Sequence, residues 1–185
     1  EEAKRRALDT ETSVPLMIDQ YLNEKSVKMF SSTGVLNEAE LNSRCEVKWE
    51  NYSMKLQIES RVLGDLVINH VIPAAKRYQT ILLQNVLSVK QVFDALEADT
   101  LNQQDILLIK RIENHASAIV AGVEMMNKER AKANHIDNQR ERAITFHNHV
   151  VPLMEEIRKH VDDLEMVIDD QLWPLPKYRE LLFIH

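Results

Sequence analysis

Histidines and carboxylates are the residues of this chain best suited to chemistry, because together they can bind a metal ion. The sequence has seven histidines. A di-iron site in a helical bundle uses Glu-x-x-His motifs on two helices, and no histidine here has a glutamate three positions before it. No histidine pair has the i, i+4 spacing of a helical zinc site, and His147 and His149 point to different helix faces. The spacing along single helices therefore predicts no metal site.

Other kinds of site find equally little support. Cys45 has no histidine near it in sequence and is predicted to be a small buried residue, not a nucleophile. Glu156 and His160 share a helix face and are predicted to make a polar surface contact. The three glycines lie too far apart for a phosphate-binding loop. We therefore expect no catalytic and no cofactor-binding residue. One acidic group is predicted to be a solvated helix face: Asp162, Asp163, Glu165, Asp169 and Asp170.

Composition predicts an all-α protein. The 185 residues include three glycines and five prolines, too few turn residues for a β or α/β domain, and are rich in helix-forming types. A net charge of −6 argues against a nucleic-acid surface. No apolar run approaches the ~20 residues that span a membrane. A single cysteine fits a reducing cytoplasm.

The longest predicted element starts after a capping box formed by Asn37 and Glu40 and continues for about sixty residues. Pro73 should kink this helix near residues 69–73 without ending it. A polar connection, residues 97–104, should then reverse the chain, with Asp99 or Thr100 as the next cap. The apolar residues that indicate the long helix recur at spacings of three and four: Cys45, Trp49, Tyr52, Leu56, Leu82, Val86, Val89, Phe93 and Leu96.

Two heptad seams follow, and a predicted turn at residues 135–138 separates them. A short connection implies antiparallel helices. We therefore predict long antiparallel helices in an elongated bundle, with a kinked first long helix and a proline-broken C-terminal segment. The first seam is Ile109, Ile112, Ala116, Ile119, Val123 and Met126. The second seam is Val150, Met154, Ile157, Val161, Leu164 and Ile168.

The two ends of the chain differ from this bundle. Residues 1–36 should form short helices or a junction to an upstream domain, with Pro15 in a first turn and Asn23 as a cap. The charged start lacks a helix-start signal, as expected of a cut through a larger protein or a frayed end. Residues 37–172 are the predicted bundle. Residues 173–185 are a predicted docking tail that either folds back on this domain or contacts a neighbour, through Trp173, Leu175, Tyr178, Leu181 and Phe183.

A short internal similarity links Asn69-His-Val-Ile-Pro73 to Asn148-His-Val-Val-Pro152. A helix distorted in the same way before each proline explains the similarity, and a duplication is the alternative. Five positions of matching type are too few to establish a duplication.

Four stretches, residues 42–52, 68–78, 132–142 and 164–183, resemble the carboxyl-terminal region of type III glutamine synthetases. The most specific part is Trp173-Pro-Leu-Pro-Lys-Tyr-Arg179, whereas Cys45 replaces an expected aromatic residue. The resemblance implies a cytoplasmic, oligomeric parent enzyme that joins glutamate to ammonia with ATP and magnesium or manganese. It also implies that the active site belongs to an upstream domain, so that this segment is noncatalytic and has a structural or assembly role. The alternative is a free-standing helical module for protein interaction or sensing.

Overall fold

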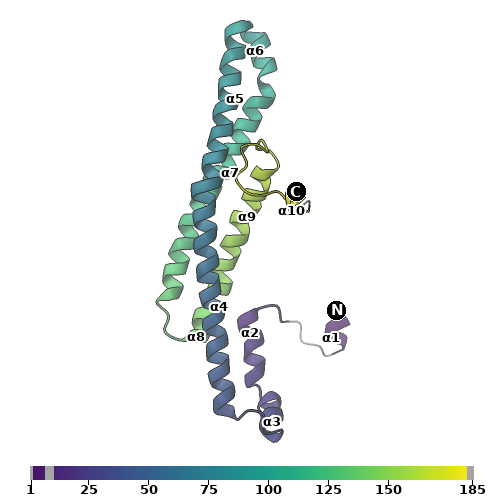
Figure 1. Cartoon of the computed structure of the whole chain (residues 1–185), viewed down its shortest axis with the longest axis vertical. Helices are drawn as coiled ribbons and strands as arrows, with labels where there is room; N and C mark the ends of the chain where they lie inside the picture. Colours follow the sequence, from purple (N-terminus) through teal and green to yellow (C-terminus); the bar gives the residue numbers. More distant parts are fainter. Residues whose placement is uncertain (1, 7–10, 183–185) are drawn as a thin grey trace. The chain divides into compact units, whose positions relative to one another are not determined.

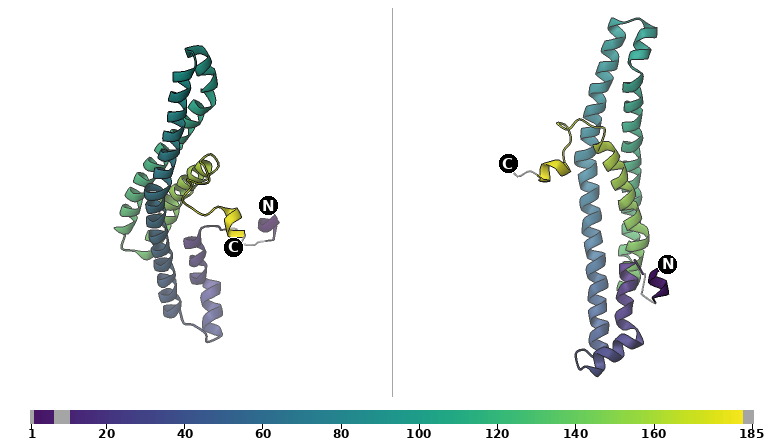
Figure 2. Two further views of the ribbon diagram at one scale, coloured as in Figure 1. Left: turned by 45° about the horizontal axis from the view of Figure 1, so that its top comes forward. Right: turned by 90° about the vertical axis from the view of Figure 1, so that its right-hand side faces the viewer.

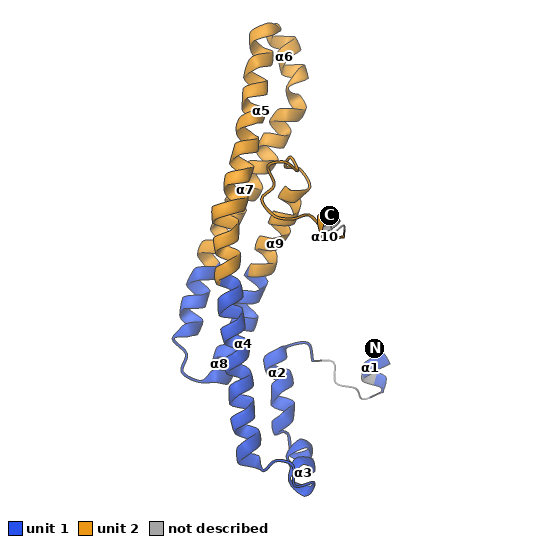
Figure 3. Cartoon of the chain, in the orientation of Figure 1, with its two compact units in different colours: residues 1–60, 126–153 blue, residues 61–125, 154–185 orange. Residues whose placement is uncertain are grey.

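Figure 1 shows the computed structural model of the chain, in which residues 2–6 and 11–182 are described. Every regular element within these ranges is a helix, which confirms the predicted all-α class. No helix in the described part of the chain is long and apolar enough to cross a membrane. The chain forms two compact units (Figure 3): residues 1–60 with 126–153, and residues 61–125 with 154–185. This division does not follow the predicted segments 1–36, 37–172 and 173–185, which stay a prediction about domains.

Short helices begin the first unit: α1 (Glu2–Arg5), α2 (Val14–Asp19), a 3-10 turn (Gln20–Leu22) and α3 (Glu24–Ser32). Pro15 lies in the first turn of α2, and the Asn23 side chain accepts a hydrogen bond from the Ser26 N–H, as predicted. Gly34 ends this region with φ of 67°, a left-handed conformation that glycine adopts without steric cost.

The core of the first unit forms where α2 packs beside α4 (Glu38–Leu66) and α8 (Gln139–Thr145), as Figures 1 and 2 show. Cys45 and Trp49 of the predicted stripe are buried there with Ile18 and Ala143. The Trp49 indole N–H donates to the Pro15 carbonyl at 3.1 Å. This hydrogen bond satisfies a polar group that would otherwise cost free energy when buried.

A reciprocal pair of hydrogen bonds opens α4. The Asn37 side chain accepts from the Glu40 N–H at 2.9 Å, and the Glu40 carboxylate accepts from the Asn37 N–H at 2.8 Å. Two backbone donors that lack helical partners are thereby satisfied. The predicted capping box is confirmed.

We expect Asn37→Ala to lower the free energy of unfolding by about 1 kcal/mol, because alanine cannot cap the first turn of α4. Thermal or urea unfolding of the 185-residue chain, followed by circular dichroism, measures the change. Asn51→Ala, an exposed position inside the same helix, is the control and should be neutral or slightly stabilising. Equal losses in the two variants would contradict the capping role.

The long helix passes through Pro73 without a break. It continues from α4 through a π-helical turn (Val67–Val71) into α5 (Ile72–Val92). Proline lacks an N–H and collides with the carbonyl four residues earlier, and the wider π turn directly before it accommodates both effects. The prediction that Pro73 does not end the helix is confirmed.

A π turn also precedes the proline in the second of the two similar segments. A π turn (Phe146–Val150) precedes Pro152, which lies in the first turn of α9 (Val151–Glu165). In both turns the residue before the proline donates its N–H five residues back, Ile72 to Val67 and Val151 to Phe146. The shared local geometry confirms that the helix is distorted in the same way before each proline, and a duplication stays the alternative explanation of the similarity.

The predicted end of the long helix is wrong. The helix ends at Val92, Phe93 is extended, and Asp94 caps α6 (Ala95–Leu101) by accepting from the Glu97 N–H at 2.9 Å. Phe93 and Leu96 are therefore 41% and 83% exposed and do not continue the buried stripe. Neither Asp99 nor Thr100 is the cap, and residues 97–104 are mostly helical.

Asn102 joins α6 to α7 (Gln103–Asn134), and its side chain donates to the Val86 carbonyl at 3.2 Å. This buried contact holds the start of α7 against α5, so that the two helices lie side by side in the second unit (Figure 2). The turn at residues 135–138 is confirmed, with Asn138 as the cap of α8. Ile109 and Met154 are partly buried, and the remaining members of both predicted seams are buried.

Close packing between α7 and α9 accompanies these seams in the second unit. A Cβ placed on Gly122 would lie 2.9 Å from Cγ1 of Ile157. His115, seven residues earlier, lies beside His160, three residues later. The contacts therefore run in opposite directions along the two helices, and this confirms the predicted antiparallel arrangement.

Candidate functional site

His115, His160 and Asp163 form the candidate site, in the second unit. His115 lies on α7, and the other two residues lie on α9. His115 directly precedes the buried Ala116, and His160 directly precedes the buried Val161. A residue next to a buried seam position lies at the edge of the helix contact. The packing of the two seams thus brings the three side chains together.

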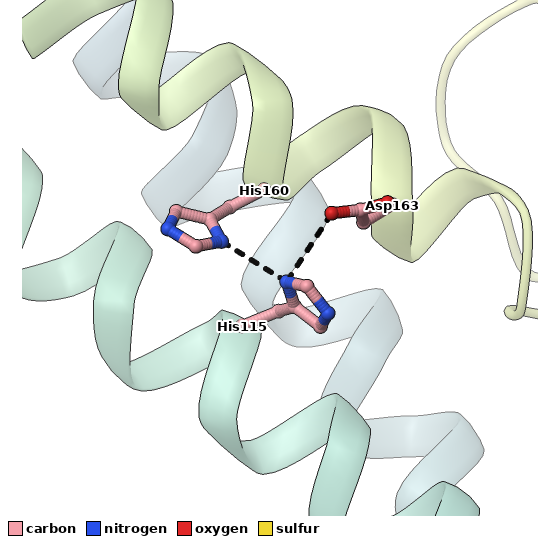
Figure 4. A group of neighbouring side chains, drawn as sticks. All are labelled: His115, His160 and Asp163. Atoms are coloured by element: carbon pink, nitrogen blue, oxygen red, sulfur yellow. Dashed lines mark hydrogen bonds and ion pairs between the residues drawn. The ribbon is translucent and has the colours of Figure 1, made fainter.

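Figure 4 shows the imidazoles facing each other, with the Asp163 carboxylate beside His115. The two Nδ1 atoms are 3.0 Å apart, and the His115 Nδ1 is 3.9 Å from Oδ2 of Asp163. One imidazole must donate its Nδ1–H and the other must accept, which requires different tautomers in a neutral pair. The side chains of His115, His160 and Asp163 are 18%, 27% and 53% exposed, so solvent reaches the site from the Asp163 side.

Glu156 adds a second carboxylate at the outer edge of this group. Its Oε1 lies 3.6 Å from Nε2 of His160, the ring nitrogen that does not face His115. The predicted polar contact between Glu156 and His160 is confirmed. Each ring nitrogen of His160 thus has a polar neighbour.

Burial lowers the pKa of His115, because the charged imidazolium loses solvation between the helices. The Asp163 carboxylate opposes this effect, while the positive charges of His160 and Arg111 add to it. The pKa of His115 is lowered overall, which favours the neutral imidazole. A neutral imidazole has the free lone pair that metal ligation requires.

Inspection of the sequence missed this site. Residue spacings within one helix cannot indicate it, because His115 and His160 are 45 residues apart and on different helices. His160 and Asp163 are i, i+3 neighbours beside the second seam, and this was the available signal. Asp163 was predicted to lie on a mostly solvated acidic face, with a cation site as the alternative. Its side chain is 53% exposed, and it also lies beside His115. Its neighbour Asp162 fits the prediction better, since it is exposed and 3.7 Å from the Arg158 guanidinium.

Cys45 lies in the core of the first unit, as predicted. It is 1% exposed, and its Sγ lies 3.8 Å from the Ile18 carbonyl oxygen. Burial raises the pKa of the thiol and disfavours the reactive thiolate. Tyr52 lies nearby on α4, and its hydroxyl is 2.8 Å from Nδ1 of His147. This hydrogen bond attaches the π turn before Pro152 to α4.

The C-terminal tail divides into a packed part and an exposed part. Trp173 is buried at 7% exposure, and Leu175 is partly buried. Lys177 donates to the Glu165 carbonyl at 3.2 Å and pairs with Asp170. Leu181, on α10 (Tyr178–Leu182), is 65% exposed. Phe183 and the side chain of Tyr178 lie outside the described residues, and the predicted interface stays a prediction.

Comparisons with known proteins agree on one family. The profile of the glutamine synthetase C-terminal domain matches residues 1–90. A glutamine synthetase of Bacteroides fragilis is 45% identical over 183 residues, which are 99% of this chain and 25% of that protein. A type-3 glutamine synthetase of Dictyostelium discoideum is 30% identical over 98% of this chain and 25% of its own length. A glutamine synthetase of Butyrivibrio fibrisolvens is 25% identical over 99% of this chain and 26% of its own length. The chain thus spans about a quarter of these relatives.

Proposed function

Because this chain belongs to the family of glutamine synthetase C-terminal domains, we propose that it is the noncatalytic helical part of an ATP-dependent glutamate–ammonia ligase. Its role is structural: it supports the upstream catalytic domain of the parent protein and contributes to assembly of a homo-oligomer. The proposed compartment is the cytoplasm.

The observation that carries this proposal is the way in which the relatives align. Nearly the whole chain corresponds to about a quarter of each glutamine synthetase. Glutamate, ammonia, ATP and the magnesium or manganese ions that the family resemblance implies are assigned to the remainder of the parent protein. No residue of this chain is proposed to contact them.

Exposed apolar side chains support a role in assembly. In the second unit, Val92 and Leu96 at the junction of α5 and α6 are 76% and 83% exposed. In the first unit, Val14, Met17 and Tyr21 line a 430 Å³ hollow and are each at least 42% exposed. Burying one such side chain against another domain contributes about 1.5–3 kcal/mol. Both surfaces are suited to contacts with the rest of the parent protein or with another subunit.

The 185-residue chain should form no detectable glutamine from glutamate, ammonia and ATP, because the proposal assigns every substrate contact to the parent's other domain. Phosphate release and glutamine formation, measured in the presence of magnesium or manganese, test this expectation. The full-length parent enzyme under the same conditions is the positive control. Turnover by the purified chain, proportional to its concentration, would overturn the noncatalytic assignment.

A free-standing interaction or sensing module is less well supported. A free-standing module would be expected to have relatives of about the same length as this chain. The relatives described above are instead about four times as long, judged from the quarter of their length that aligns.

A further inference from the structure

We propose that His115, His160 and Asp163 form a binding site for a divalent transition-metal ion, with Zn²⁺ as the best-fitting ion. The site lies within the second unit and goes beyond the structural role proposed above. Among the described residues, these three bring their potential ligand atoms within 4.8 Å of one another. All three residues belong to this chain, so the site does not require any other part of the parent enzyme.

The distances are close to those of a metal site. Zinc bound tetrahedrally, with bonds of about 2.0–2.1 Å, separates its ligand atoms by about 3.3 Å. The two Nδ1 atoms here are 3.0 Å apart, and the His115 Nδ1 is 3.9 Å from Oδ2 of Asp163. His160 and Asp163 lie toward the solvent side, where small side-chain rotations can bring the three atoms around one ion.

The ligand types select the class of ion. Two imidazole nitrogens and one carboxylate oxygen suit zinc and similar transition metals, whereas magnesium and calcium prefer sites built from oxygen. The proposed ion therefore differs from the magnesium or manganese that the family resemblance implies for catalysis. Three protein ligands leave a fourth position for water, and the 53% exposure of the Asp163 side chain leaves room for it.

The helices hold the ligands in place before any ion binds. Ala116 and Val161, each directly after a histidine ligand, are buried at 2% and 9% exposure, so the backbone beneath the imidazoles is anchored. Ligands on packed helices are positioned more precisely than ligands on loops. Glu156 lies 3.6 Å from Nε2 of His160, where a carboxylate can orient an imidazole that ligates through Nδ1.

Metal binding would replace the hydrogen bond between the two imidazoles. That hydrogen bond needs one ring to carry its proton on Nδ1, whereas ligation by both Nδ1 atoms needs both protons on Nε2. The bound ion would join α7 to α9 and stabilise the folded second unit, because the unfolded chain does not hold the three ligands together.

The test uses the tag-free 185-residue chain with Zn²⁺ and Co²⁺ as probes. Competition with a chromophoric chelator measures zinc stoichiometry and affinity, and the visible spectrum of bound Co²⁺ reports the coordination geometry. We expect one Zn²⁺ per chain, a four-coordinate Co²⁺ spectrum, and a melting temperature several degrees higher with zinc. His160→Gln and Asp163→Asn should each weaken zinc binding at least about tenfold, since changes in outer-shell partners alone cost 10–100-fold.

Matched controls separate the site from general surface binding. His149→Gln and Asp162→Asn change exposed residues of the same types outside the group and should leave zinc affinity unchanged. His160→Cys supplies another zinc ligand and should retain binding while changing the Co²⁺ spectrum. Circular dichroism verifies folding, and Asp163→Asn, at the most exposed ligand, decides the matter if a His160 variant unfolds. Absence of zinc binding, or equal losses in site and control variants, would overturn the proposal.

Discussion

Ile119→Asp should abolish cooperative thermal unfolding of the second unit. Ile119 is fully buried in the first seam, on α7. The substitution removes about 1.5–3 kcal/mol of apolar burial and places a carboxylate where it has no ionic partner, at a further cost of several kcal/mol. Because a typical domain has about 5–15 kcal/mol of net stability, we expect loss of the melting transition in circular dichroism and rapid proteolysis.

Val120→Asp is the matched control for this prediction. Val120 is the next residue on the same helix and is 37% exposed. Both variants place aspartate inside α7, so the difference between them isolates burial from helix propensity. The control should lose about 1 kcal/mol or less. If Ile119→Asp and Val120→Asp melted alike, the seam assignment would be wrong.

The helical seams were predictable because they depend on local periodicity. Ile112, Ala116 and Ile119 recur at helical spacing, and a helix can bury that stripe only by turning it toward a neighbour. The capping box at Asn37 was predictable for a similar reason, since its two partners are three residues apart. The similarity around Pro73 and Pro152 predicted that the helix is distorted before each proline. It did not predict that the distortion is a π turn.

The end of the long helix was not predictable from periodicity alone. Phe93 and Leu96 continue the apolar rhythm of α5, yet the chain turns at Phe93. Asp94, and not Asp99, caps α6, because its side chain accepts a hydrogen bond from the Glu97 N–H. An apolar stripe indicates which face of a helix is buried while the helix continues. It does not indicate the residue at which the helix ends.

The candidate metal site was missed for a physical reason. His115 and His160 meet because two seams pack in one particular antiparallel register, with Gly122 close to Ile157. Many registers are compatible with the same heptad spacing. The side-chain types were visible in the sequence, but their proximity depends on packing between helices. Sites of this kind become predictable when the register is known.

Trp173→Ala should lower the free energy of unfolding by about 3 kcal/mol, the lower end of the range for removing a buried tryptophan. Trp173 is 7% exposed, so its indole loses most of its contact with water. Its Nε1–H is buried without a hydrogen-bond partner among the described residues, and this unpaired donor offsets part of the gain from burial. Urea unfolding of the 185-residue chain measures the loss.

Comparison variants distinguish self-packing of the tail from docking elsewhere. Trp173→Phe keeps much of the apolar area and removes the unpaired donor, so it should cost clearly less than Trp173→Ala. Leu181→Ala, at a 65% exposed position, should change stability by less than about 0.5 kcal/mol. If Trp173→Ala left unfolding of this chain unchanged but reduced assembly of the parent enzyme, the indole would belong to an interface with another domain or subunit. Because Trp173 is already buried in this chain, we expect Trp173→Ala to destabilise the chain itself. Leu181 and its exposed neighbour Leu182 are better placed than Trp173 for contacts outside this domain.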